Sequence, residues 1–388
     1  MDKKNSWLKV LLMVLSYILV AAVACSTTIY YMYKQPSDKL SYLQLLVDTY
    51  YIGEVDQAAL EDGMANGLVE ALPDRWSYYI PKDSVRANQE NLDNAYIGIG
   101  VTITVRQDGT GFDVDRIEPG SGADDAGIRP GDVVVGVEEF RVSDHTVSEI
   151  TDIIRGEDGT VVNIVILRDG QELTIPVTRE TIKTKVATGQ LLNGEVGYIT
   201  IKNFNSRCAQ ETIEQIRQLQ EEGATAFIFD IRFNPGGYKS ELVKLLDYLL
   251  PEGDLFRSQL YNGQETVDTS DSGCLEVPMA VLINGNSYSA AEFFAAALRE
   301  YEWATLVGEK TVGKGYFQST FNLPDGSAVA LSIGKYFTPK GVCLEEIGGL
   351  TPDVEVSVDS KTAAMIYSGQ LDPMEDIQVL AALEALKK

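Results

Sequence analysis

The strongest constraint on this 388-residue chain is a long apolar stretch near its amino terminus. Leu8–Ile29 is apolar apart from one lysine and a few hydroxyl residues. As a helix, such a stretch is about long enough to cross the ~30 Å hydrocarbon core of a bilayer. Lys3 and Lys4, which precede it, favour a cytoplasmic amino end. We therefore expect residues 1–35 to form a cytoplasmic tail and a single-pass anchor in the cell membrane.

Two alternatives remain for this segment. The small residues Ala21, Ala22 and Ala24 also suit the cleavage site of a signal peptide, which would release a secreted protein. Cys25 is an alternative lipid attachment point, although Ala22 is a poor residue three places before a lipidated cysteine. All three interpretations place the rest of the chain outside the cytoplasm.

Composition excludes several classes of function. Acidic residues outnumber basic ones 57 to 32, for a net charge of −25, which argues against nucleic-acid binding through phosphate contacts. A single histidine, His145, excludes most zinc sites and nearly excludes Ser-His-Asp catalysis. The four cysteines stand far apart, without CxxC spacing. We expect no metal and no cofactor.

The segment 36–94 is predicted to be an N-terminal helical region. Leu40, Leu43 and Val47 fall on one helical face, and a second helical run covers 58–72. The turn-rich stretch Asp74–Tyr79 follows. We interpret that stretch as a packing or oligomerisation element.

Residues 95–180 change to a strand pattern. Five short apolar runs, separated by Gly and Asp turns, are interrupted by one amphipathic helix at about 147–155. The runs are 100–105, 112–117, 133–137, 161–167 and 172–177. This pattern predicts a small β-rich domain with one short helix.

Three strings in this segment resemble a PDZ domain. Tyr96–Val101 stands where that family has its carboxylate-binding loop, and Glu118–Ala123 with Ala126–Asp132 looks like the bacterial PDZ signature. Glycines leave backbone N–H groups free to bind a terminal carboxylate, and a strand edge can pair with an incoming peptide. The resemblance implies peptide binding at Ile97, Gly98, Ile99 and Gly100.

From 181 to 360 strand and helix signals alternate, which predicts an α/β domain with its site at the carboxyl ends of the strands. Expected strands are 196–201, 226–231, 277–283 and 304–308, with a helix at 207–222. The tail 361–388 is predicted to be helical. In it, Asp372–Leu386 is expected as one helix with Ile377, Leu380, Leu383 and Leu386 facing inward. The fold class is thus α/β multidomain.

Three loops of the α/β segment carry candidate chemistry. Asp230–Gly237 ends in Pro-Gly-Gly, a sharp turn that exposes N–H groups for an oxyanion or serves as a plain turn. Ser287 and Ser289 precede a helix, where either is a nucleophile or an ordinary N-cap. Lys314 lies between two glycines and is a solvated lysine or, if desolvated, a general base.

Together these loops resemble the carboxyl-terminal processing (tail-specific) proteases, serine–lysine peptidases with an inserted PDZ domain. The strings that carry the resemblance are Asp-x-Arg-x-Asn-Pro-Gly-Gly, Asn-x-x-Ser-x-Ser-Ala-x-Glu and Gly-Lys-Gly-x-x-Gln. By that family's motifs, Ser289 is the nucleophile, Lys314 the general base and Gln318 the residue that orients the lysine. The oxyanion donors map to the N–H groups of Gly236 and Ala290.

The resemblance implies a serine endopeptidase that recognises the carboxyl-terminal segment of its substrate through the PDZ domain and cleaves through an acyl-enzyme. We expect protein or peptide substrates with free carboxyl termini, a regulatory protein partner and a homodimer. Two residues depart from the family pattern, namely Phe233, where an Asn is usual, and Tyr288, within the serine string.

Two other functions fit parts of the sequence. A catalytically inactive PDZ scaffold at the membrane would keep the α/β segment as structure alone. A peptidase of the signal-peptidase type also uses Ser and Lys but lacks the PDZ module and the Pro-Gly-Gly loop. His145 falls in the PDZ segment, far in sequence from Ser289, and we expect it to be structural.

Overall fold

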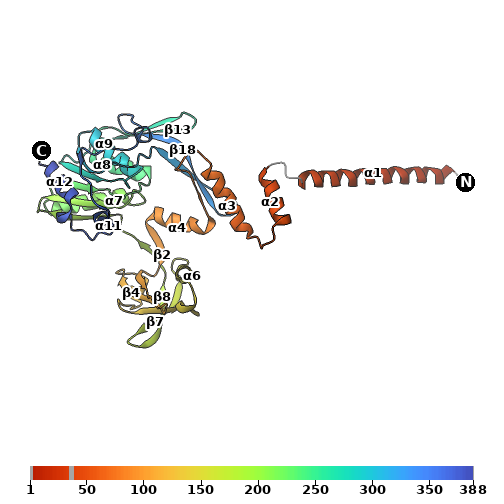
Figure 1. Ribbon diagram of the computed structural model, residues 1–388, viewed down its shortest axis with the longest axis horizontal. Coiled ribbons are helices and arrows are strands. Elements are labelled where there is room, and N and C mark those ends of the chain that lie inside the picture. The colour runs from red at the N-terminus through yellow and green to blue at the C-terminus, as the bar shows by residue number, and fades with distance from the viewer. Residues whose placement is uncertain (1–2, 35–38, 388) are drawn as a thin grey trace. The chain divides into compact units, whose positions relative to one another are not determined.

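In this computed structural model, residues 3–34 and 39–387 are described, and they divide into two units, 1–68 and 69–388. The first unit consists of helices α1 (Lys3–Lys34), α2 (Lys39–Tyr50) and most of α3 (Gln57–Glu70) (Figure 1). Within α1, Val10–Thr28 is long and apolar enough for either a membrane anchor or a signal sequence. The expected boundary at residues 35 and 36 lies outside the described residues.

A six-stranded sheet forms the centre of the second unit. Its order is β10-β11-β12-β15-β16-β19, in which β10 runs antiparallel to β11 and all later neighbours are parallel. The strands are β10 (Ala187–Leu192), β11 (Val196–Ile201), β12 (Ala226–Asp230), β15 (Met279–Ile283), β16 (Ala304–Gly308) and β19 (Val354–Glu355). The strands β11, β12, β15 and β16 confirm the alternating α/β pattern.

Helices cover both faces of this sheet (Figure 1). Alternate residues of β12 face opposite sides, because successive side chains of a strand point in opposite directions. Phe227 and Phe229 pack in the core that includes α7 (Cys208–Glu221), α8 (Lys239–Leu249) and α9 (Ala290–Glu300). Ile228 packs in the smaller core beneath α12 (Ile377–Ala385). These strands are nearly continuous apolar runs because both faces of the sheet are covered.

A second, antiparallel sheet has the order β1-β18-β13-β14, with β17 on the other side of β18. Its strands are β1 (Tyr78–Ile80), β13 (Gly253–Leu260), β14 (Glu265–Ser270), β17 (Tyr316–Asn322) and β18 (Ala328–Phe337). Thus β1, which begins in the stretch Asp74–Tyr79 expected to be turn-rich, belongs to a sheet built otherwise from residues after 250.

The PDZ domain is a sheet of order β3-β4-β5-β7-β8, with the short β6 (Phe140–Arg141) beside β5. Its other strands are β3 (Val101–Val105), β4 (Phe112–Ile117), β5 (Val133–Val137), β7 (Val161–Arg168) and β8 (Gln171–Thr178). These strands and helix α6 (Val147–Ile154) confirm the expected elements of this domain. β3 is an edge strand, which leaves one side open for a peptide.

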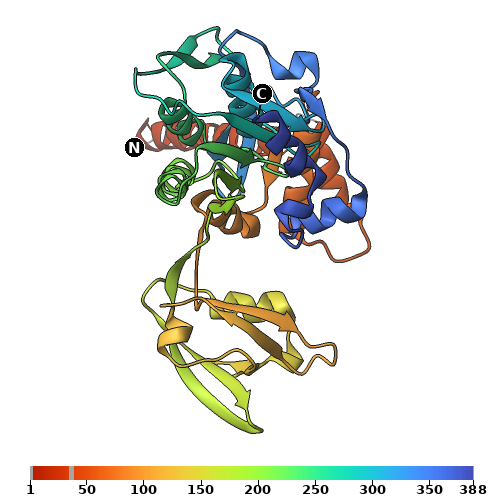
Figure 2. The same ribbon diagram turned by 90° about the vertical axis from the view of Figure 1, so that its left-hand side faces the viewer.

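The domain is inserted into the chain through two paired segments. Helix α4 (Lys82–Asp93) leads into β2 (Ala95–Gly98), and β9 (Glu180–Lys183) leads out. β2 and β9 pair antiparallel, so the entering and leaving segments run side by side (Figure 2).

The expected single helix over Asp372–Leu386 is wrong. A short 3-10 turn at Pro373–Glu375 comes first, and α12 begins only at Ile377, because Asp376 caps it by accepting the N–H of Gln378. The inward face is confirmed in part. Leu383 is buried and Leu386 packs against the same core, as expected, but Gln378, Val379 and Ala382 are also buried, whereas Ile377 is 51% and Leu380 39% exposed. Polar contacts of Gln378 turn that residue inward, which periodicity of apolar residues does not reveal.

Candidate active site

Ser289 lies at the junction between β15 and α9, in a backbone conformation that only a constrained turn imposes. Its φ and ψ are 58° and −129°, a region that non-glycine residues rarely occupy and that costs of order 1–3 kcal/mol. A strained turn of this kind exposes a serine at the start of a helix in other hydrolases. The residue itself is 8% exposed.

The Pro-Gly-Gly loop closes tightly on this serine. A Cβ placed on Gly236 would stand 2.8 Å from the Cβ of Ser289 and 2.9 Å from the backbone nitrogen of Ala290. Gly236 also has φ of 86°. Any side chain here would therefore collide with the candidate nucleophile, which explains the glycine.

Asn234 holds this loop in place. Its side-chain amide donates to the carbonyl of Ile201 over 2.7 Å, and its carbonyl oxygen accepts the N–H of Gly236 over 2.9 Å. The Gly236 N–H, expected as an oxyanion donor, is thus already engaged. The N–H of Ala290, the first residue of α9, has no bonded acceptor within the described chain.

Ser287, the alternative nucleophile, is fully buried and has a structural role. Its hydroxyl donates to the carbonyl of Ile231 over 2.8 Å and accepts the N–H of Asn284 over 3.1 Å. These bonds join the loop after β15 to the loop after β12. Ser287 therefore offers no accessible oxygen to a substrate.

Glu292 connects the serine turn to the lysine loop. This fully buried carboxylate accepts N–H groups from Ser289 over 3.0 Å and from Gly313 and Lys314 over 2.8 Å each. The hydroxyl of Thr311 also donates to it. Burial raises the pKa of Glu292, although these hydrogen bonds favour its ionised form. Sequence analysis noted Glu292 within the serine string but gave it no role.

Lys314 has its amine beside a pair of stacked aromatic rings. The Nζ atom lies 5.0 Å from the ring centre of Trp76 and 5.9 Å from that of Tyr288, and the two rings stack 6.2 Å apart. Burial lowers the pKa of Lys314 to about 8, against the nearby charges of Asp74 and Glu292, which raise it. The amine is therefore partly neutral near neutral pH, as a general base requires.

The turn Asp74–Ser77 is the part of the site that sequence analysis missed. Asp74 accepts the hydroxyl of Ser77 over 2.6 Å and the N–H of Trp76 over 3.0 Å. The indole N–H of Trp76 donates to Glu345 over 2.9 Å. The short run Tyr78–Ile80 consists of residues that favour strands, which suits β1, but nothing local indicates that Trp76 covers Lys314.

Gln318 does not contact the lysine amine in this structure. Its amide donates to the hydroxyl of Ser332 over 2.9 Å, across the β17–β18 pair. Within residues 39–387, no hydrogen bond joins Lys314 Nζ to Ser289 or to Gln318. The two expected dyad residues thus belong to neighbouring loops that Glu292 connects, and their side chains are not hydrogen-bonded to each other in this structure.

A buried ionic cluster fixes the start of the Pro-Gly-Gly loop. Arg232 donates to Asp230 over 2.9 and 2.5 Å, and to Asp376 and Gln378 over 2.7 Å each. Burial opposes the charge of Arg232, but the carboxylates outweigh it and raise its pKa. This cluster therefore connects helix α12 to the start of the Pro-Gly-Gly loop.

The two departures from the family pattern make aromatic contacts. Phe233 packs edge-on against Tyr367 of α11 (Ser360–Tyr367), with ring centres 5.4 Å apart, and Tyr288 stacks on Trp76. Phe233 has φ of 62°, a left-handed conformation that asparagine tolerates better than phenylalanine.

The expected peptide-binding residues of the PDZ domain lie at the end of its open edge. Ile97 and Gly98 pair with β9, while Ile99 and Gly100 lead into the edge strand β3. Gly100 has φ of 79°, and a Cβ there would collide with Ser121. His145, in the same domain, packs against Phe140 with ring centres 5.3 Å apart and is 31% exposed.

The sequence is similar to known proteins over most of its length. Residues 195–356 match the model of peptidase family S41, and residues 92–167 match that of the PDZ domain. The carboxy-terminal processing protease CtpA of Bacillus subtilis (strain 168) is 30% identical over 324 residues, or 83% of this chain and 69% of that protein. A protein of Staphylococcus aureus (strain N315), described as a probable CtpA-like serine protease, is 29% identical; the match covers 82% of this chain and 64% of the relative.

Among solved structures, the photosystem II D1 C-terminal processing protease is 26% identical, with 82% of this chain and 87% of that chain covered and a TM-score of 0.47. The family assignment rests on the sequence relatives and the two family models. The chain belongs to the carboxy-terminal processing proteases of peptidase family S41, which are serine peptidases, and carries a PDZ domain.

Proposed function

We propose that Ser289 is the nucleophile of an endopeptidase and that Lys314 is its general base. The observation that carries this proposal is the strained turn of Ser289, which places its side chain against Gly236 at the amino end of a buried helix. An N-cap serine without a catalytic role needs no such strain, because extended backbone is the usual conformation there.

In the proposed reaction, neutral Lys314 accepts the proton of the Ser289 hydroxyl as its oxygen attacks the scissile carbonyl. The tetrahedral oxyanion is held by the N–H of Ala290 and by the glycine pair, with Gly236 releasing Asn234 or Gly237 taking its place. Protonated Lys314 then gives its proton to the departing amine. A water molecule, activated in the same way, hydrolyses the acyl-enzyme.

Substrate binding completes the dyad in this proposal. Catalytic hydrogen bonds often tighten only once substrate is present. Gln318 would orient the lysine after exchanging its bond to Ser332. The PDZ domain would capture the substrate's free carboxyl terminus along β3, and residues 1–35 would anchor the protein, with the peptidase outside the cytoplasm.

A fluorophosphonate probe tests this function directly, because it forms a covalent bond only with an activated serine. We expect mass spectrometry to find the label on Ser289, and Ser289→Ala to abolish both labelling and peptide cleavage. His145→Ala is the matched control and should label normally. Labelling of another serine would place the nucleophile elsewhere, whereas no labelling would favour the alternative of a catalytically inactive PDZ scaffold.

A further inference from the structure

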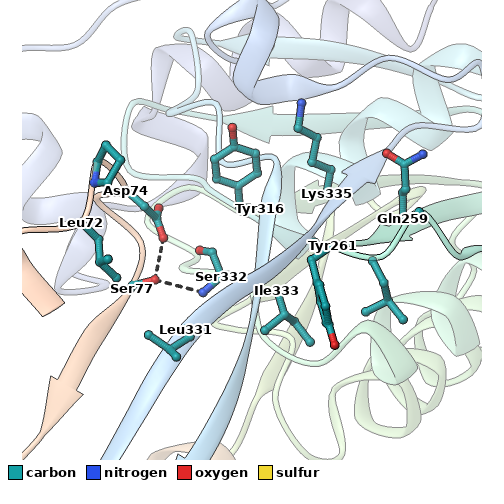
Figure 3. A pocket seen from close by; sticks show the side chains of 14 residues that line it. Leu72, Asp74, Ser77, Gln259, Tyr261, Tyr316, Leu331, Ser332, Ile333 and Lys335 are labelled. Atoms are coloured by element: carbon teal, nitrogen blue, oxygen red, sulfur yellow. Dashed lines mark hydrogen bonds between the residues drawn. The ribbon is translucent and has the colours of Figure 1, made fainter.

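A cavity of about 580 Å³ opens on the second sheet, beside the lysine loop (Figure 3). Its floor is the part of β18 between two neighbouring strands. β1 stops pairing with β18 at Ala330, and β13 starts at Gly334, on the same side. Leu331, Ser332 and Ile333 therefore have no strand beside them on that side within the described residues.

The backbone of this gap is nevertheless satisfied. The N–H of Ser332 donates to the hydroxyl of Ser77 over 3.0 Å, and the carbonyl of Ile333 accepts the N–H of Tyr261 over 2.8 Å. A strand that entered here would find these groups already bonded. The cavity is thus suited to receive side chains rather than to extend the sheet.

The lining favours an apolar guest. Its apolar lining residues include Leu72, Leu260, Leu331 and Ile333. The charged groups are engaged: Asp74 binds Ser77 and the N–H of Trp76, and Lys335 pairs with Glu346 over 3.2 Å. Figure 3 shows Asp74 and Ser77 on one side of the cavity and Tyr261 on the other.

Three features connect this cavity to the proposed catalytic residues. Tyr316, in its wall, stands two residues after Lys314, and Ser332, in its floor, accepts the amide of Gln318. The turn Asp74–Ser77 forms another wall, and Trp76 of the same turn covers Lys314. The volume lies in the ~300–1,000 Å³ range typical of ligand sites.

We propose that this cavity is a substrate subsite that receives an apolar side chain from the polypeptide segment being cleaved. The proposal rests on the proposed function, since it assumes acyl transfer at Ser289. In this proposal, the second sheet selects the side chain near the cleaved bond, whereas the PDZ domain separately captures the carboxyl terminus of the substrate.

The test is a specificity profile of the full chain with two variants that change the cavity in opposite directions. Ile333→Trp fills it and Ile333→Ala enlarges it. Substrates are otherwise identical peptides in which one position at a time, on either side of the cleaved bond, carries Ala, Leu or Phe. Val267→Trp, on β14 of the same sheet and outside the cavity, is the matched control.

We expect Ile333→Trp to lower kcat/KM for Leu and Phe relative to Ala, at one position, by about tenfold or more. Ile333→Ala should shift preference at that same position towards Phe. Val267→Trp should retain the parent profile. The ester p-nitrophenyl acetate has no side chain to place in the cavity, so it should acylate all three variants at the parent rate. That result would show that the site is folded in each variant.

Two results would contradict the proposals, and they are distinguishable. An unchanged Leu-to-Ala and Phe-to-Ala ratio in both Ile333 variants, with turnover that depends on Ser289, overturns the subsite alone. An equal loss of rate with every peptide and with the ester also overturns the subsite, because the cavity would then affect catalysis and not the choice of substrate side chain. Turnover that survives Ser289→Ala overturns the proposed function and the subsite with it.

Discussion

The amine of Lys314 lies 5.0 Å from the ring centre of Trp76, although the whole PDZ domain separates the two residues in the sequence. A π-face attracts the protonated amine, whereas the removal of water disfavours it. Burial outweighs the nearby carboxylates of Asp74, Glu292 and Glu345 and lowers the pKa of Lys314 to about 8. Trp76 is therefore expected to tune the general base.

Trp76→Ala should raise the pKa that governs turnover. Water then reaches the Lys314 amine, so its charged form is better solvated. The neutral amine is the active form, so kcat increases with pH through this pKa, and an upward shift lowers kcat at neutral pH by about tenfold per unit. The measurement is kcat against pH. Trp76→Phe keeps an aromatic ring but loses the hydrogen bond to Glu345, so the pKa of Lys314 should stay almost as low as in the parent protein.

The same profile separates lysine from histidine as the base. His145→Ala should leave the ionisation in place, because His145 packs within the PDZ domain. Loss of the ionisation in this variant would refute the serine–lysine assignment. An unchanged midpoint in Trp76→Ala would show that the indole does not control the environment of the amine.

Ser289→Ala and Lys314→Ala should each reduce cleavage by roughly 10⁴-fold or more, and the double variant should be hardly worse than either. Both groups take part in the same proton transfer, so removing the second costs little once the first is gone. Single-turnover kinetics on one peptide measure this. Additive losses would mean that the two residues act in separate steps.

Glu292→Ala should lower both stability and activity. The change leaves the N–H groups of Ser289, Gly313 and Lys314 buried without their acceptor, which costs about 3 kcal/mol or more of unfolding free energy. Urea unfolding followed by circular dichroism measures the loss. Glu221→Ala, an exposed glutamate on α7, is the control. Normal kcat in a Glu292→Ala protein would exclude Glu292 as the positioning residue of the two loops.

Arg232→Met should destabilise the protein by about 3–5 kcal/mol, because Asp230 and Asp376 then stay buried without a cation. Arg141→Met removes an exposed pair with Glu172 and should change stability little. Thermal unfolding compares the two variants. Similar midpoints would indicate that the buried cluster contributes no more than a surface pair.

A peptide with a free, apolar carboxyl terminus should bind the PDZ domain more tightly than its amide. Amidation removes the charge that the N–H groups around Ile99 and Gly100 are expected to meet. Calorimetry on the full chain with Ser289→Ala prevents cleavage during the titration. Equal affinities for acid and amide would contradict recognition of a terminal carboxylate at this edge.

The sequence predicts the contacts within each loop better than those between loops. The turn chemistry of Asn234–Gly237 and the serine–helix junction are encoded in contiguous strings, so they could be located before the fold was known. The position of Trp76 depends on β1 joining β18, a pairing across most of the chain. Likewise, the inward turn of Gln378 follows from its bond to Arg232, which a pattern of apolar residues does not contain.

The insertion of the PDZ domain has a consequence for biogenesis. Trp76 and β1 are synthesised before the PDZ domain, and Ser289 and Lys314 long after it. Domains generally fold as units while the chain is made. A ribosome-bound chain that ends after the PDZ domain therefore contains a folded PDZ domain but neither residue of the proposed dyad. Under the proposed function, the newborn chain would capture a carboxyl terminus before it is able to cut one.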